Sequence, residues 1–228
     1  MEKSKMKEAQ YQCMLDAQKN IGLPSLGLMS GYCWLSDPKH LLFHLSRYKF
    51  VSKCFNGFTS VLEVGCADGF GTRIVSQEVK TVTAIDFDPI FIRDAREKQK
   101  PPNKIEFLEH DILKGPLNTE FDGIFSMDVL EHIAPEQELS FLKNIVKSLA
   151  STGTLILGTP SLQSQMYASK ASKEGHINCK DHLQLRSFLK EFFNNVFLFS
   201  MNDEVVHTGF YPMAHYLIAL CCCPKPLT

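Results

Sequence analysis

Short apolar runs alternate with segments of helical periodicity along most of the chain. Apolar runs bounded by turn residues predict strands, whereas apolar residues spaced three or four apart predict one face of a helix. The helices expected between strands lie at 72–77, 88–100 and 135–150. Strands that alternate with helices form a parallel sheet covered on both faces. The expected strands lie at 61–64, 81–86, 104–109, 121–127 and 154–158.

The C-terminal part departs from this alternation. After a helix predicted at 181–193, strands at 195–200 and 215–222 follow without a helix between them. Two consecutive strands joined by a loop pair antiparallel, because a parallel connection needs a crossover. The sequence therefore predicts a mostly parallel sheet that ends in a reversed strand.

The N-terminal part is more weakly patterned. A helical pattern around Met14 leads into a glycine-rich loop expected at 22–31. Asp37-Pro38 then predicts a helix start, since aspartate is a preferred N-cap and proline suits the first helical position. We expect an N-terminal helical cap over residues 1–55 and one α/β domain over residues 56–228.

Composition narrows the classes of function. The net charge of −1 gives no basic footprint of the kind that nucleic-acid binding requires. The N-terminus has no apolar run typical of a signal peptide, and the longest apolar run, 216–223, is too short to span a bilayer. The eight cysteines include no C-x-x-C pair, which favours reduced thiols. These features favour a cytoplasmic protein without a nucleic-acid or membrane partner.

The loop after the first predicted strand indicates a bound nucleoside. Glycines let the backbone approach a ligand closely, and Asp86 follows about 20 residues later, where an acid can accept hydrogen bonds from ribose hydroxyls. A dinucleotide fingerprint would need glycine at positions 65, 67 and 70, but Ala67 and Phe70 occupy two of them. The loop therefore disfavours a nicotinamide cofactor.

Read as acid-x-G-x-G-x-G, the segment from Glu63 to Gly69 resembles motif I of the class I S-adenosylmethionine-dependent methyltransferases, with Ala67 in place of the middle glycine. The resemblance implies S-adenosylmethionine as cofactor and a Rossmann-like α/β fold. In that fold a seven-stranded sheet is mostly parallel with its last strand antiparallel, and helices cover both faces. The cofactor-binding residues that the resemblance implies are Glu63, Gly65, Cys66, Ala67, Gly69, Asp86, Phe87, Asp111, Ile112 and Met127.

The resemblance also assigns roles within this set. The glycine loop would face the methionine tail, and Asp86 would bind the ribose. Phe87 would cover one face of the adenine, Asp111 would accept from its exocyclic amine, and the backbone N–H of Ile112 would donate to its ring.

The segment after the fourth predicted strand lies, in this family, between cofactor and methyl acceptor. Transfer to oxygen requires positioning and removal of a proton. His132 has the side chain for that role, although it could equally serve only the start of a helix. His176, in the loop after the fifth strand, is the second catalytic candidate.

A metal site is an open alternative. Asp128-x-x-Glu131-His132 resembles the ligand set of the metal-dependent ubiquinone-pathway and small-RNA 2′-O-methyltransferases, in which a later histidine, here His176, completes the site. A divalent metal would lower the pKa of an acceptor hydroxyl. Asp128 departs from that pattern because aspartate is the shorter acid.

Two polar segments, 159–179 and 201–211, are expected to face the acceptor, the first as a lid. Their side chains favour O-methylation of a small hydroxylated acceptor such as a sugar. Two alternatives stay open: a module that binds the cofactor without turnover, and an aminopropyl transferase on the same fold. The identity of the acceptor and the oligomeric state are not predicted.

Overall fold

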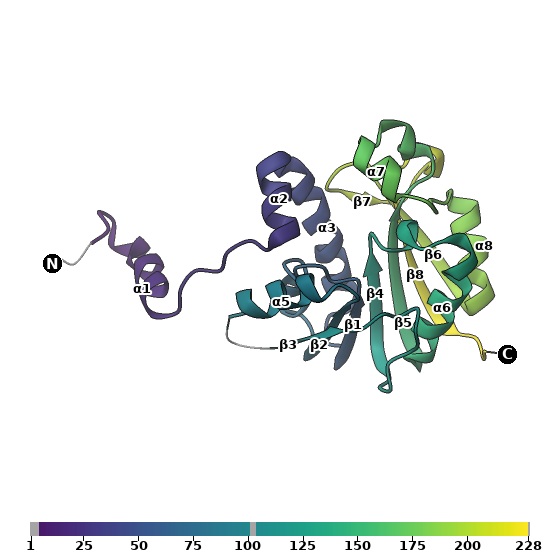
Figure 1. Cartoon of the computed structure of the whole chain (residues 1–228), viewed down its shortest axis with the longest axis horizontal. Helices are drawn as coiled ribbons and strands as arrows, with labels where there is room; N and C mark the ends of the chain where they lie inside the picture. Colours follow the sequence, from purple (N-terminus) through teal and green to yellow (C-terminus); the bar gives the residue numbers. More distant parts are fainter. Residues whose placement is uncertain (1–4, 101–103, 228) are drawn as a thin grey trace.

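A computed structural model describes residues 5–100 and 104–227 and shows an α/β domain built around one sheet (Figure 1). The strands are β1 Ser60–Val64, β2 Thr81–Asp86, β3 Ile105–Glu109, β4 Phe121–Met127, β5 Leu149–Pro160, β6 Phe193–Met201, β7 Val206–His207 and β8 Tyr216–Pro224. The helices are α1 Gln12–Asn20, α2 Leu28–Ser36, α3 Pro38–Cys54, α4 Thr72–Val75, α5 Pro89–Lys98, α6 Glu138–Lys147, α7 Lys170–Gly175 and α8 His182–Phe192.

The sheet has the strand order β3-β2-β1-β4-β5-β8-β6-β7. Strands β1 to β5 are parallel, and β8 runs antiparallel to both of its neighbours, β5 and β6. The predicted fold class, including its reversed last strand, is confirmed. The described residues form eight strands rather than seven, because the two-residue β7 pairs with Ser200 and Met201 at the sheet edge. A strand of two residues is too short to show a period of two.

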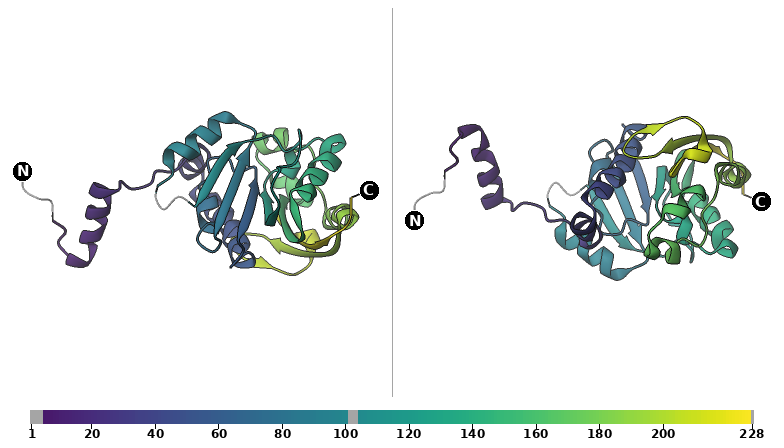
Figure 2. Two further views of the ribbon diagram at one scale, coloured as in Figure 1. Left: turned by 90° about the horizontal axis from the view of Figure 1, so that it is seen from below. Right: turned by 90° about the horizontal axis from the view of Figure 1, so that it is seen from above.

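Helices cover both faces of the sheet, as Figure 2 shows. Helices α3, α4 and α5 pack on one face, where Val51 and Phe55 are fully buried. Helices α6 and α8 pack on the other, where Phe141 and Leu189 are fully buried. The carboxyl ends of the parallel strands are left uncovered by these layers, so ligand-binding loops gather there.

Two helices begin at the aspartate-proline pairs seen in the sequence. The Asp37 side chain accepts a hydrogen bond from His40 N at the start of α3, and the Asp88 side chain accepts one from Ile90 N at the start of α5. In each case a side-chain oxygen satisfies an amide of the first turn that has no partner within the helix.

The prediction of a loop at 22–31 is wrong in its second half, where α2 begins. The Leu28 amide donates to Asp94 Oδ2 at 2.8 Å, and Ser30 donates to Asp68 through its amide at 2.6 Å and its hydroxyl at 3.1 Å. These carboxylates lie 66 and 38 residues further along the chain. The helix start is therefore stabilised from elsewhere in the fold, which no local pattern can reveal.

The residues expected to form an N-terminal cap divide into two parts in the structure. Helix α1 lies away from the domain and has no buried residue (Figures 1 and 2). Helix α3, by contrast, packs against the sheet through Tyr48 and Val51, which join its apolar core. Helix α3 is thus close enough to the strand ends to contribute side chains to a site there.

The predicted loop at 159–179 contains ordered structure. A 3-10 helix, Gln163–Tyr167, and helix α7 fill most of it, and Ser161 forms a parallel bridge with Lys180 at its far end. The segment shows no apolar periodicity because none of the residues of either helix is buried.

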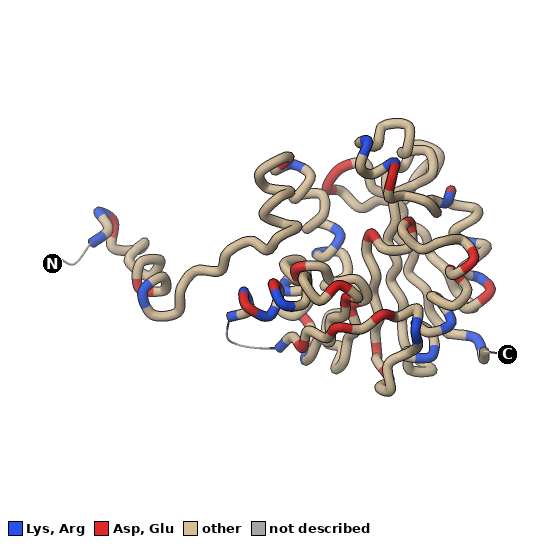
Figure 3. Tube along the Cα trace, in the orientation of Figure 1, with Lys and Arg blue, Asp and Glu red and all other residues tan. Residues whose placement is uncertain are grey.

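Lysine and arginine positions are interspersed with aspartate and glutamate positions along the trace of the domain (Figure 3). Helix α2 carries no charged residue. Within residues 5–100 and 104–227, no helix is both long and apolar enough to cross a membrane.

Candidate functional site

A cavity of about 540 Å³, here called the loop cavity, opens at the carboxyl ends of the parallel strands. The loops that follow β1 to β4 all contribute to its wall. Its position agrees with the rule that open α/β sheets bind ligands at this edge. The wall includes six of the ten residues predicted to bind the cofactor, which are Gly65, Ala67, Asp86, Phe87, Asp111 and Ile112.

The backbone of the β1 loop makes room for this cavity. Gly65 has φ +82°, and a Cβ at that position would lie 2.3 Å from Val129 Cγ2. Ala67 has φ +46°, a left-handed conformation unusual for a residue with a side chain. The Ala67 amide donates to Asp86 Oδ2 at 2.9 Å, which holds the strained turn against the end of β2.

Asp86 is largely buried and joins two loops. Besides the Ala67 amide, it accepts a hydrogen bond from Asp88 N at Oδ1, 2.9 Å away. A carboxylate has about four acceptor positions, so acceptor capacity is left for a ligand in the cavity. Asp86 can therefore hold the loop and bind hydroxyl groups at the same time.

Asp111 and Ile112 lie on the loop cavity after β3. Asp111 Oδ1 accepts from Leu113 N at 3.0 Å, so Asp111 stabilises a turn as well as facing the cavity. The Ile112 carbonyl accepts from Asn144 Nδ2 at 2.7 Å, which fixes this loop to α6. Phe87 is 74% exposed at the cavity wall, where a flat ligand could cover it.

Two other residues that were predicted to bind the cofactor are buried beside the β1 loop. Glu63 is buried and accepts a hydrogen bond from the Tyr48 hydroxyl at 2.9 Å. Burial raises the pKa of Glu63 to about 8 despite that hydrogen bond. Cys66 is also buried, and neither residue lines the loop cavity.

Gly69 and Met127 likewise lie outside the cavity wall. A Cβ on Gly69 would lie 2.4 Å from Phe107 Cε1, so this glycine permits close packing of the loop on β3. Met127 is buried, and its sulfur lies 3.8 Å from the Tyr216 hydroxyl. The structure thus places four of the ten predicted cofactor residues behind the site.

A second cavity of about 440 Å³, here called the histidine cavity, adjoins the first. Its wall includes five histidines together with Arg47, Glu131, Asn202, Asp203 and Tyr216. Both polar segments expected to face the acceptor reach it. Met29, Asp128 and His132 line both cavities, so they mark the junction between them. The histidines are His40, His44, His132, His176 and His215.

Three of the four predicted metal-ligating residues come together. One ligand atom from each of Glu131, His132 and His176 lies within 4.8 Å of the others. The His132 Nδ1 donates to the Gly175 carbonyl at 2.9 Å, and the His176 Nδ1 donates to Gln165 Oε1 at 3.0 Å. Each imidazole therefore keeps Nε2 available for a proton or a metal.

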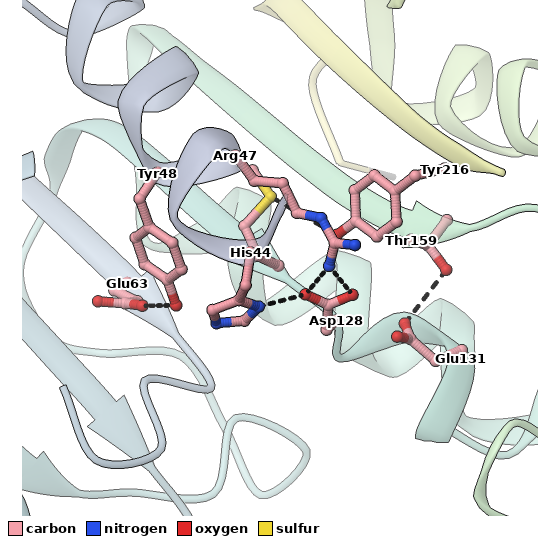
Figure 4. A network of polar contacts seen from close by, with 9 residues as sticks. His44, Arg47, Tyr48, Glu63, Asp128, Glu131, Thr159 and Tyr216 are labelled. Carbon is pink, nitrogen blue, oxygen red and sulfur yellow. Dashed lines mark hydrogen bonds and ion pairs between the residues drawn. The ribbon is translucent and has the colours of Figure 1, made fainter. Parts of the chain in front are cut away.

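Glu131 is almost fully buried, and burial together with the charge of Asp128 raises its pKa. Its Oε2 accepts from Thr159 Oγ1 at 3.1 Å (Figure 4), whereas Oε1 has no hydrogen-bond partner within the described residues. Burial and the nearby His132 lower the pKa of His176. Both shifts favour the neutral forms of Glu131 and His176.

Asp128 does not join this group of three. Its two carboxylate oxygens accept hydrogen bonds of 2.7 and 2.6 Å from Nη1 of Arg47, and His44 Nδ1 lies 3.4 Å away (Figure 4). Burial would raise the pKa of Asp128, but the charge of Arg47 and the hydrogen bond with His44 hold it well below its usual range. Asp128 is therefore an ion-pair partner here, contrary to its predicted place in the metal-ligand set.

Several residues of the site could not be predicted from the sequence. Arg47 and His44 lie on α3, about 80 residues before Asp128, and Met29 lies on the unpredicted α2. Tyr216 begins the last strand, and its ring lies 3.7 Å from the guanidinium carbon of Arg47. Each reaches the site only through tertiary packing.

The strand order with its reversed strand β8, and a cavity at the ends of β1 and β2, together define the class I methyltransferase fold. Residues 62–157 match the family model described as a methyltransferase domain. Residues 62–157 therefore carry a methyltransferase domain, and the chain is similar to S-adenosylmethionine-dependent methyltransferases.

The chain spans about half the length of the curated relatives described here. The chain is 28% identical over 141 residues to the mitochondrial ubiquinone biosynthesis O-methyltransferase of Schizosaccharomyces pombe, a match that covers 56% of this chain and 50% of that protein. It is 34% identical over 110 residues to nodulation protein S of Azorhizobium caulinodans, covering 47% and 53%.

Among solved structures, the N-methyltransferase NodS from Bradyrhizobium japonicum in complex with S-adenosyl-L-homocysteine superposes with a TM-score of 0.64. That match has 23% sequence identity and covers 84% of this chain and 91% of the other. The likeness supports the same fold.

Proposed function

We propose that this protein transfers a methyl group from S-adenosylmethionine to an oxygen of a small polar acceptor, with a sugar-like hydroxylated molecule as the expected class. The observation that carries the proposal is the pair of adjoining cavities, which share Met29, Asp128 and His132. A group transfer between two bound molecules needs two sites that meet at the reacting atoms.

The loop cavity suits the nucleoside of the cofactor. Asp86 offers a largely buried carboxylate at the end of β2, and Asp111 offers another after β3. Together with the exposed ring of Phe87, these groups match a ribose and an adenine. Six of the ten residues predicted to bind the cofactor therefore line the same cavity.

The histidine cavity suits an acceptor that must lose a proton. His132 stands at the junction, and its Nδ1–H donates to the Gly175 carbonyl. That hydrogen bond leaves the lone pair on Nε2, which is the form of imidazole that accepts a proton. His132 is accordingly the proposed base, and His176 beside it is the proposed positioning group, with ring centroids 5.2 Å apart.

A divalent metal fits the same residues. Among the residues that the structure describes, Glu131 Oε1 has no hydrogen-bond partner, and both histidines direct their Nδ1–H to an oxygen, which is typical of metal-ligating imidazoles. Glu131, His132 and His176 would hold the metal, and it would lower the pKa of an acceptor hydroxyl. With a metal bound, Gln165 and the Gly175 carbonyl would orient the two rings.

The two alternatives fit less well. An aminopropyl transferase would need several anionic groups for the ammonium groups of a polyamine, but the pKa of Glu131 is raised and the histidine cavity also holds the positive charge of Arg47. A module that only binds the cofactor would not need the polar second cavity at the junction.

Calorimetry first tests the cofactor. S-adenosylmethionine and S-adenosylhomocysteine should bind in the micromolar range, on the order of 1–100 μM, and NADH should not. Binding of NADH alone would overturn the assignment. Labelled S-adenosylmethionine offered with a panel of sugar nucleotides, catechols and amines then identifies the acceptor. Label transferred to an amine, and to none of the hydroxyl compounds, would overturn O-methylation.

A chelator separates the two roles of the histidines. If a metal is bound, removing it should abolish transfer, and adding Mg²⁺ or a transition metal should restore it. If His132 acts as a base, transfer should survive chelation and be lost in His132→Ala. Full transfer by both His132→Ala and His176→Ala would exclude both roles.

A further inference from the structure

Asp128 lies at the junction between the loop cavity and the histidine cavity. It follows β4 directly, has φ +57°, and its amide donates to the Gly158 carbonyl at 3.1 Å. Of the three residues that line both cavities, it is the only carboxylate. Its side chain is 27% exposed and that of its ion-pair partner Arg47 is 11% exposed, so Asp128 is the more exposed residue of the pair.

The left-handed backbone at Asp128 is held by contacts from α3 and β5, and β8 supports the contact from α3. Arg47 of α3 donates to both carboxylate oxygens from one nitrogen, and His44 lies beside them (Figure 4). The Arg47 guanidinium in turn lies against the Tyr216 ring of β8. A residue in a sparsely populated backbone conformation persists where its surroundings fix it.

The location of the sulfonium follows from the proposed function, on which this inference rests. The transferred methyl group must point from the loop cavity into the histidine cavity, so the positively charged sulfur lies at the junction. Arg47 lines only the histidine cavity, whereas Asp128 faces both. The negative end of the ion pair is therefore the end nearer to the sulfonium.

We infer that Asp128 is the residue that recognises the positive charge of the sulfonium, and that Arg47 is a positioning residue that holds Asp128 at the junction. Asp128 would then distinguish the charged cofactor from its neutral demethylated product. Other charged or titratable groups face Asp128 from α3, from the segment after β4 and from β8, namely His40, His44, Glu131, His132 and Tyr216. None of these five residues is a carboxylate that lines both cavities.

The test compares the dissociation constants of S-adenosylhomocysteine and S-adenosylmethionine by calorimetry at one pH, and it needs no acceptor. Asp128→Asn keeps the shape of the side chain and removes its charge. We expect the preference for S-adenosylmethionine over S-adenosylhomocysteine to fall roughly fivefold, as for the loss of a partly screened attraction between charges. An unchanged preference would overturn the role of Asp128.

Arg47→Lys tests positioning, because it keeps the positive charge but lacks the guanidinium, whose Nη1 reaches both oxygens and whose carbon lies over the Tyr216 ring. The preference should fall part of the way towards that of Asp128→Asn, and Arg47→Lys should have no further effect when Asp128 is already asparagine. The matched control is Arg96→Lys on α5, whose guanidinium binds the Phe107 carbonyl away from both cavities.

Two outcomes would overturn the positioning role. One is a wild-type preference in Arg47→Lys. The other is an equal fall whether or not Asp128 is present, which would show that Arg47 acts independently. If the wild-type protein bound neither compound, the proposed function itself would fail, a result distinct from binding of both with an unaltered preference.

Discussion

The Tyr48 hydroxyl donates a 2.9 Å hydrogen bond to Glu63 Oε1, and both side chains are at least 97% buried between α3 and β1. This contact joins the helix that carries Arg47 to the strand that leads into the cofactor loop. The second oxygen of Glu63 has no partner within the described residues, and burial raises the pKa of the group to about 8. Glu63 is thus protonated in the folded protein at neutral pH.

The free energy of unfolding should fall as pH rises from about 4.5 to about 8. Glu63 has a pKa of about 4.3 when unfolded, so between these values the folded protein holds a proton that the unfolded chain releases. The slope is at most about 1.4 kcal/mol per pH unit for one group. Urea unfolding at several pH values measures it.

Glu63→Gln should remove the contribution of Glu63 to the pH dependence of the free energy of unfolding. The amide oxygen of the glutamine can still accept the hydrogen bond from Tyr48. Glu131, whose pKa is also raised, contributes in the same direction, so Glu131→Gln is the matched comparison. A slope in Glu63→Gln equal to that of the wild type would show that Glu63 is ionised when folded.

Asp86→Ala should weaken binding of S-adenosylhomocysteine at least tenfold, because hydrogen bonds to a carboxylate contribute about 1.5–3 kcal/mol each. Thermal stability should fall as well, since the amides of Ala67 and Asp88 lose their acceptor. Glu109→Ala is the control: Glu109 pairs with Asp86 in register at the end of β3 but does not line the cavity. Equal affinity in both variants would remove Asp86 from the ribose site.

Gly65→Ala should lose cofactor binding and stability together. The added Cβ would lie 2.3 Å from Val129 at a φ of +82°. Gly57→Ala has nearly the same φ of +83° but no atom within 4 Å, so it should cost only about 1–2 kcal/mol of stability. The difference between the two isolates the steric effect of Val129. Calorimetry and thermal unfolding that rank the two variants equally would contradict the close packing at Gly65.

Replacing residues 163–173 with a short glycine-serine linker should spare affinity for S-adenosylhomocysteine and abolish methyl transfer. This segment contributes to the histidine cavity through Ser172, and none of its residues lines the loop cavity. Gln165→Ala should lower transfer less, because it keeps the segment and removes only the side-chain hydrogen bonds to His176, Ser161 and Ser164. Loss of cofactor affinity in the folded deletion variant would place the segment in the cofactor site instead.

The strands were predictable because parallel strands buried on both faces appear as apolar runs. The same runs located Asp86, which ends β2, and Asp111, which follows β3. A place near the end of a strand does not reveal which way a side chain faces, so the sequence could not predict that Glu63 and Met127 lie outside the wall of the loop cavity. The expected cytoplasmic location and the absence of nucleic-acid partners stay predictions.

The ion pair between Asp128 and Arg47 could not be predicted from the sequence, for a physical reason. Asp128, Glu131 and His132 have the spacing of a ligand set, but Arg47 approaches from a helix 81 positions earlier and takes the first carboxylate. Local spacing describes what neighbouring residues could do, whereas the fold decides which partner lies nearest. For the same reason, the sequence did not predict that Met29 lies at the junction of the two cavities.

The two cavities draw on different parts of the chain. Apart from Met29, every residue on the wall of the loop cavity falls within 62–157, whereas most of the histidine cavity comes from α2, α3 and the residues after 159. Substitutions in these outer parts can therefore alter the acceptor while the cofactor half stays intact. The segment that matches the family model thus builds one cavity almost alone, whereas the other cavity depends on parts of the chain outside that match.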